Sequence, residues 1–157
     1  MAVLTDFHQA ELNAAKAMRS WGFIDAVATT GGADGGLDVR SALALAQVKW
    51  RSGKTGRPEV QQLYGARAAG NHQLFFFSKS GYTNEAKAYA DSVGVALFVI
   101  DAAGGVGAAN RHALPFVTKW WALPFVDVTL GEWAMLSLFG VALGSGIVFM
   151  LVLQANW

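Results

Sequence analysis

Residues 31–51, GGADGGLDVRSALALAQVKWR, carry the pattern that most constrains the fold. The glycines at their start predict a turn, because glycine takes positive φ at little steric cost. The apolar stretches that follow, at 37–41 and 43–50, predict two short strands joined as a hairpin. A sheet is therefore expected, with this hairpin as part of it.

Helical and strand patterns flank the hairpin on both sides. Upstream, apolar residues three or four apart predict a helix over 3–21, and an apolar run predicts a strand over 23–30. Downstream, the pattern predicts a helix over 58–69, a strand over 73–78, a helix over 83–93 and a strand over 95–100. The order α-β-β-β-α-β-α-β predicts an α/β fold with a mixed sheet flanked by helices.

The composition limits the classes of chemistry and partner. The 157 residues carry a net charge of +1, so a nucleic-acid partner would have to be met by a local basic patch. The chain has no cysteine, which excludes disulfides, thiolate metal ligands and a cysteine nucleophile. The apolar fraction of 54% is above the usual level for soluble domains, and the excess is not spread evenly.

The character of the sequence changes after Asp101, which predicts a first domain over 1–101. Residues 102–110 are rich in glycine and alanine and predict a linker. Tryptophans and isolated charges over 114–133 predict a segment at a membrane interface, and the alternative is a short helix packed on the first domain. Residues 134–153 carry no charge over 20 positions and predict a transmembrane helix, because about 20 helical residues span the hydrocarbon layer.

Basic residues predict the orientation of this single-pass helix. Lys119 and the earlier basic residues lie on its N-terminal side, whereas residues 154–157 contain none. The positive-inside rule then places the first domain in the cytoplasm, tethered to the inner (cytoplasmic) membrane.

Three polar residues of the predicted hairpin form a candidate site. Gln47 and Lys49 lie two apart in a strand, so their side chains face the same side. Both interrupt an apolar strand, which is unfavourable unless they have partners, and Asp38 on the neighbouring strand is the obvious one. A carboxylate beside a lysine and an amide suits Mg²⁺ and an attacking water, because hard cations prefer oxygen ligands.

The residues that carry this site also resemble a known family. The turn Gly32–Asp38 (GADGGLD) and the triplet Gln47–Lys49 (QVK), followed by QLYGARA and FFSKSGYTNEAKAYA, resemble the Mrr-type branch of the restriction endonuclease-like superfamily. The resemblance covers about residues 10–100. It implies an α-β-β-β-α-β core and a metal-dependent endonuclease that hydrolyses DNA with Mg²⁺ or Mn²⁺.

The resemblance implies a role for each matching residue. Asp38 would be the main metal ligand, Gln47 would take the place of a second acidic ligand through its amide oxygen, and Lys49 would be the catalytic lysine. The family usually has a glutamate on the first helix, which Glu11 would supply. The residue before that glutamate is commonly phenylalanine in the family, and this chain has Ala10 there.

Basic residues near the predicted site are expected to contact DNA phosphates. Arg51, Lys54 and Arg57 follow the strand that carries Lys49, and Lys79 follows the next predicted strand. The alternative is an ordinary exposed loop. Double-strand cleavage generally needs two active sites, so a homodimer is a reasonable expectation.

Several candidate residues also have a purely structural interpretation. Asp38 could cap a turn or pair with Arg40, and Asp34 lies in the glycine turn, where aspartate bonds its own backbone. Glu11 could be a solvated charge on the helix. Because glutamine replaces the second acid, the chain could also be a non-catalytic, membrane-anchored module that binds nucleic acid.

Overall fold

The computed structural model of the protein describes residues 4–29 and 36–118. Asp34, residues 119–133 of the predicted interfacial segment and the predicted transmembrane helix over 134–153 lie outside the described residues. Among the helices within 4–29 and 36–118, none has the length and apolar character needed to cross a membrane.

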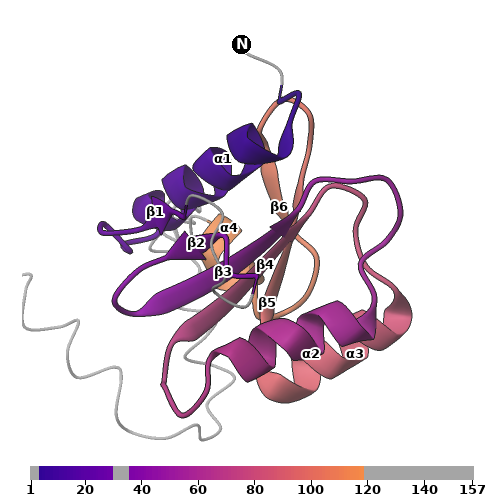
Figure 1. Cartoon of the computed structure of the whole chain (residues 1–157). Helices are drawn as coiled ribbons and strands as arrows, with labels where there is room; N and C mark the ends of the chain where they lie inside the picture. Colours follow the sequence, from indigo (N-terminus) through magenta and orange to yellow (C-terminus); the bar gives the residue numbers. More distant parts are fainter. Residues whose placement is uncertain (1–3, 30–35, 119–157) are drawn as a thin grey trace, which may run out of the picture. The chain divides into compact units, whose positions relative to one another are not determined.

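A six-stranded mixed sheet forms the centre of the described part, as predicted. The strands follow one another across the sheet in chain order (Figure 1), and they are β1 (Val27–Ala28), β2 (Val39–Arg40), β3 (Ala44–Lys49), β4 (Gln73–Ser78), β5 (Ala96–Ile100) and β6 (Val106–Ala108). The first three strands pair antiparallel, β3, β4 and β5 pair parallel, and β6 returns antiparallel to β5.

Helices cover both faces of this sheet (Figure 1). Helix α1 (Phe7–Ser20) packs on one face, and α2 (Arg57–Ala66) and α3 (Asn84–Val93) pack together on the other. Alternate residues of the strands therefore belong to two separate apolar clusters. The α1-side cluster includes Ala46 and Val48 of β3, and the α2/α3-side cluster includes Leu45.

The first helix and the first strand are shorter than the sequence predicts. Helix α1 begins after Asp6, whose carboxylate accepts a hydrogen bond from the backbone N–H of Gln9 at 2.9 Å. The predicted strand over 23–30 is reduced to two residues, because the chain first closes the helix end. The N–H of Phe23 donates back to the carbonyl of Met18, with Gly22 at φ 102° between them.

The sheet continues beyond residue 101, where the sequence predicts a linker. Residues 101–105 form a tight turn in which Asp101 accepts a hydrogen bond from the N–H of Gly105 at 2.8 Å, and β6 follows. The glycines that suggested flexibility therefore belong to a hairpin. Helix α4 (Leu114–Val117) comes next, and its Phe116 packs against the α1-side cluster.

Candidate active site

Asp38 is fixed between two strands at the point where β2 begins. Its N–H donates to the carbonyl of Ala46 and its carbonyl accepts from the N–H of Thr29, each at 2.9 Å. Its carboxylate oxygen Oδ2 accepts from the N–H of Val48 at 2.7 Å. The carboxylate thus has a fixed position beside β3.

Burial and charge act in opposite directions on this carboxylate. Burial raises the pKa of Asp38 above its ordinary value, while the Val48 N–H and the positive charge of Lys49 partly oppose the rise. Lys49 is therefore close enough to interact with Asp38, as the sequence predicts. A further cation beside Asp38 would act as Lys49 does: it would lower the pKa of the carboxyl group and favour its charged form.

Gln47 lies at the centre of the sheet, with a side chain that is 1% exposed. Its place in β3 puts it on the same face as Leu45 and Lys49, the face covered by α2 and α3. The amide oxygen Oε1 is buried and has no hydrogen-bond partner among the described residues. A buried carbonyl oxygen without a partner is unfavourable by about 1–3 kcal/mol, so a ligand that fills this place would relieve the cost.

Gly36 makes room for the Gln47 side chain. A Cβ atom added at Gly36 would lie 2.9 Å from Nε2 of Gln47 and 3.6 Å from Nε2 of Gln62 on α2. Gly36 also has φ +81°, a conformation that L side chains rarely adopt. Gly36 therefore leaves space for the Gln47 amide. Gln62 was not singled out by the sequence, because its position on a helix gave no chemical signal.

Glu11 reaches the same site from α1. Its carboxylate is half-buried and lies 3.5 Å from Nδ1 of His8. Burial and then the negative charge of Asp38 raise the pKa of Glu11, with His8 acting in the opposite direction. The two carboxylates are therefore electrostatic neighbours. The pairing with His8 corrects the simple interpretation of Glu11 as a solvated charge.

These side chains suit a hard divalent cation. Asp38 and Glu11 supply two carboxylates that repel each other, and Gln47 supplies a buried amide oxygen without a partner among the described residues; all three are ligands of the kind that Mg²⁺ and Mn²⁺ prefer. In the described part of the chain, no three His, Cys, Asp or Glu side chains come together. The third protein oxygen would therefore come from Gln47.

The predicted DNA-binding residues lie in the segments that follow the carboxyl ends of β3 and β4. Because β3 and β4 are parallel, the segments that follow them, 50–57 and 79–82, emerge together, and the hydroxyl of Ser80 donates to the carbonyl of Arg51. Lys79 lies 4.8 Å from the Trp50 ring centroid and Lys54 is exposed.

The two arginines of this group already have partners. The guanidinium of Arg51 pairs with the Glu59 carboxylate, and that of Arg57 stacks on the Tyr89 ring at 5.1 Å. Contact with DNA remains a prediction for all four basic residues.

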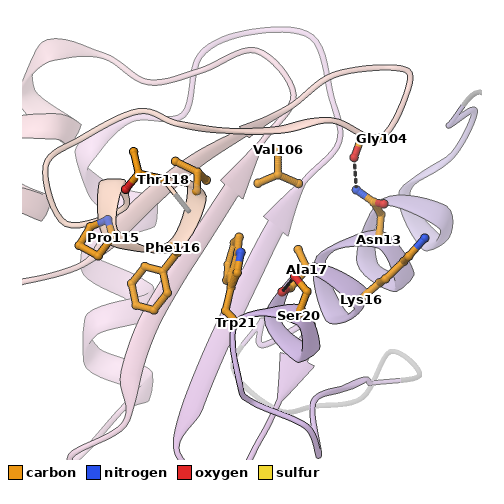
Figure 2. Close-up of a pocket in the computed structure, with 11 residues that line it drawn as sticks. Asn13, Lys16, Ala17, Ser20, Trp21, Gly104, Val106, Pro115, Phe116 and Thr118 are labelled. Atoms are coloured by element: carbon orange, nitrogen blue, oxygen red, sulfur yellow. Dashed lines mark hydrogen bonds between the residues drawn. The ribbon is translucent and has the colours of Figure 1, made fainter. Parts of the chain in front are cut away.

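A separate pocket on the α1 side of the sheet lacks the groups needed for this chemistry. Figure 2 shows Trp21 and Phe116 lining it, with the Asn13 amide donating to the carbonyl of Gly104. Its volume is about 670 Å³, and Lys16 is its one charged lining residue among those described. It contains no carboxylate to hold a metal ion, so the Asp38 site is the stronger candidate.

We expect the substitution Asp38→Asn to stabilise the metal-free protein at neutral pH. Below the ordinary pKa of 3.8 the carboxyl group is protonated in the folded and unfolded chains alike. Above it, the raised folded-state pKa makes ionisation unfavourable for the folded state, and a neutral amide at this position removes that penalty. Urea unfolding in EDTA should show a gain at neutral pH that disappears as the pH falls below 3.8.

The matched control is Asp25→Asn, for which the opposite sign is expected. Hydrogen bonds from the Ala42 N–H and the Ser41 hydroxyl lower the pKa of Asp25. That variant should lose stability at neutral pH and match the wild type in acid. A loss of stability in Asp38→Asn at neutral pH would contradict the account.

Comparisons with known proteins identify a family for this sequence. The sequence matches the restriction endonuclease family Mrr_cat over residues 5–102, which is more than half of the chain. One similar solved structure is a crystal structure of a protein of unknown function, with 18% identity and a TM-score of 0.42. The alignment covers 60% of this chain and 57% of that one. No curated protein matches the sequence.

Proposed function

The chain belongs to the Mrr_cat restriction endonuclease family, and from that premise we propose that it is a metal-dependent endonuclease that hydrolyses DNA at the Asp38 site. The observation that carries the proposal is the buried amide oxygen of Gln47, which has no partner among the described residues and lies in the same row of β3 as Lys49. A role in restricting foreign DNA would fit this chemistry.

Each site residue has a distinct task in this proposal. Asp38, Glu11 and the Gln47 oxygen would hold Mg²⁺ or Mn²⁺, which when bound supplies Lewis acidity and lowers the pKa of a nucleophilic water. The ammonium group of Lys49 lies at the solvent-facing end of β3, where it can orient the attacking water and donate to a phosphate oxygen. Its positive charge offsets the negative charge that builds up on the phosphate during hydrolysis.

A plasmid assay tests the proposal. The full chain is incubated with supercoiled plasmid in Mg²⁺, in Mn²⁺ or in EDTA, and the products are separated by electrophoresis. We expect nicked or linear DNA with either metal and none in EDTA. If no divalent metal supports cleavage while plasmid binding is retained, the endonuclease proposal is wrong.

That last outcome defines the second candidate function, a non-catalytic module that binds nucleic acid. The observation that favours it is Gln47 itself, since a neutral amide binds divalent cations more weakly than a carboxylate does. The two functions differ in cleavage and share DNA binding, so the same assay separates them.

We also propose that residues 134–153 tether this enzyme to the inner membrane, with the domain in the cytoplasm. The support is the absence of charge over those 20 positions and the position of Lys119 before them. The full chain should sediment with membranes and resist extraction by alkaline carbonate. Release by carbonate would rule out a spanning helix.

A further inference from the structure

A second pocket lies on the α2/α3 side of the sheet, next to the candidate site. It has a volume of about 410 Å³ and lies between β2, β3 and the carboxyl end of α2. Its lining residues are Leu37, Arg40, Ser41, Leu45, Ala66, Arg67 and His72. Two arginines and a histidine line it, and none of the described lining residues has a carboxylate, so its described wall is cationic.

Two buried nitrogen atoms at this pocket lack partners. Nε of Arg67 and Nδ1 of His72 have no hydrogen-bond acceptor among the described residues. A buried donor without an acceptor is unfavourable, and more so on a charged group. An anion in the pocket would remove that cost for Arg67, whose planar fork matches the oxygens of a phosphate group.

The local backbone holds both side chains in position. The Arg67 guanidinium stacks 4.7 Å from the centroid of the Tyr64 ring, which limits its rotation. The turn after α2 contains Ala68 at φ 49°, and a Cβ atom at Gly70 would lie 2.6 Å from Nδ1 of His72. The backbone at Gly70 thus packs directly on the imidazole, and the pocket is formed before any ligand enters.

The charges in this pocket favour an anion. The carboxyl end of α2 carries a partial negative charge equivalent to about half an electron. Arg67 brings a full positive charge against it, and Arg40 lines the same pocket. Asp25, an exposed residue, is bonded to the hydroxyl of the lining residue Ser41.

Two residues of the pocket wall are near the candidate active site along the chain. Leu37 precedes Asp38 in the chain, and Leu45 lies in the same row of β3 as Gln47 and Lys49. Four residues of a strand span about 13 Å, which corresponds to roughly four nucleotides of one DNA strand at 3.4 Å each. A strand whose phosphate lies at Lys49 would therefore present another phosphate near the pocket.

We propose that the Arg40–Arg67–His72 pocket binds a backbone phosphate of the nucleic acid, a few nucleotides from the bond that is cut. This rests on the proposed function for the location of the cut. The pocket lies towards the opposite end of β3 from Arg51, Lys54 and Lys79, so the substrate strand would be held on both sides of Lys49. Arg67 supplies the specific contact, and Arg40 and His72 complete the walls.

DNA binding without cleavage tests this proposal separately from catalysis. The full chain is titrated against a fluorescein-labelled duplex in EDTA, with anisotropy recorded over a series of salt concentrations. Arg67→Gln should weaken binding about tenfold and lower the slope of log K against log salt by about one, because one phosphate contact is lost. His72→Gln should also weaken binding, but by a smaller factor than Arg67→Gln does.

The matched control is Arg111→Gln, which removes the same charge at an exposed position after β6. It should leave both affinity and slope unchanged. Unfolding curves of every variant show whether it folds. If Arg67→Gln does not fold, the affinity of His72→Gln for the duplex tests the proposal in its place.

Three results would overturn the proposal. The first is equal binding by Arg67→Gln and Arg111→Gln. The second is a wild-type chain that does not bind the duplex. The third concerns the melting temperature of the protein with and without inorganic phosphate. If Arg67→Gln abolishes the rise that phosphate produces but leaves duplex binding intact, the pocket binds a free anion and not the nucleic acid.

The binding titration does not measure cleavage, so it tests the pocket separately from the endonuclease activity. Combined with the plasmid assay, it distinguishes the failure of one proposal from the failure of the other. A wild-type chain that cuts DNA while Arg67→Gln binds normally would refute the pocket alone. A chain that binds through Arg67 and never cuts would refute the endonuclease alone.

Discussion

Replacing Lys49 with alanine is expected to reduce DNA cleavage by at least about 10²–10³-fold, the usual loss when one charge-stabilising donor is removed from an active site. Lys49 lies at the end of β3, close enough to Asp38 to lower the pKa of that carboxyl group. Its loss removes the positive charge that offsets the developing phosphate charge. It also leaves Asp38 with less support for its ionised form.

DNA binding in this variant should weaken by no more than about tenfold, the loss expected for one phosphate contact, so cleavage should fall much further than binding does. The measurement is a single-turnover rate on a labelled duplex in Mg²⁺, together with affinity in EDTA. Lys87→Ala is the matched control, since Lys87 is exposed on α3 and belongs to no proposed site. Cleavage by Lys49→Ala at the wild-type rate would remove the catalytic assignment.

The second large effect is expected for Gln47→Glu, which restores the acidic residue that the general superfamily motif has at this position. A third carboxylate should increase the affinity for Mg²⁺ or Mn²⁺ by at least about tenfold, because hard cations bind charged oxygen more strongly than amide oxygen. The metal concentration that gives half-maximal cleavage should fall accordingly.

The same substitution should destabilise the metal-free chain. Gln47 is 1% exposed, and a carboxylate in its place would be a buried negative charge on the strand next to Asp38. Such a buried charge without a partner costs several kcal/mol or titrates to its neutral form. Urea unfolding in EDTA measures the loss, and saturating Mn²⁺ should restore the stability. Gln61→Glu, at an exposed position of α2, is the control for added charge. Unchanged metal dependence in Gln47→Glu would mean that residue 47 is not a ligand.

The sequence predicts the centre of this fold well because local patterns decide it. Strand β3 and its parallel neighbours β4 and β5 are short apolar runs bounded by glycine or polar residues, and the structure confirms them. Helix α3 begins after Thr83 and ends at Gly94, both of which are cap signals visible in the sequence.

The predictions that differ from the structure depend on non-local contacts. Phe23 looks like a strand residue, yet it packs against the α1-side cluster from a turn that the Arg19 side chain holds through the Ala26 carbonyl. Strand β6 has a glycine and alanine composition typical of linkers, and only its pairing with β5 makes it a strand. No local pattern contains that information.

The candidate site shows the same division. Motif and strand periodicity placed Asp38, Gln47 and Lys49 together, and the structure brings Glu11 close to Asp38. The sequence could not show that the Gln47 oxygen lacks a partner among the described residues, or that Gly36 provides the space beside it. Nor does any local pattern show that His72 is half-buried in a pocket that Arg67 also lines.

If Asp38 belongs to a metal site that cuts DNA, its removal should abolish Mg²⁺-dependent cleavage. Cleavage of a labelled duplex is followed at increasing Mg²⁺ concentration for the wild-type full chain and for Asp38→Ala. The account predicts that cleavage by the wild type rises to saturation with Mg²⁺ and that Asp38→Ala gives none at any concentration. Equal, Mg²⁺-dependent cleavage by both chains would contradict it.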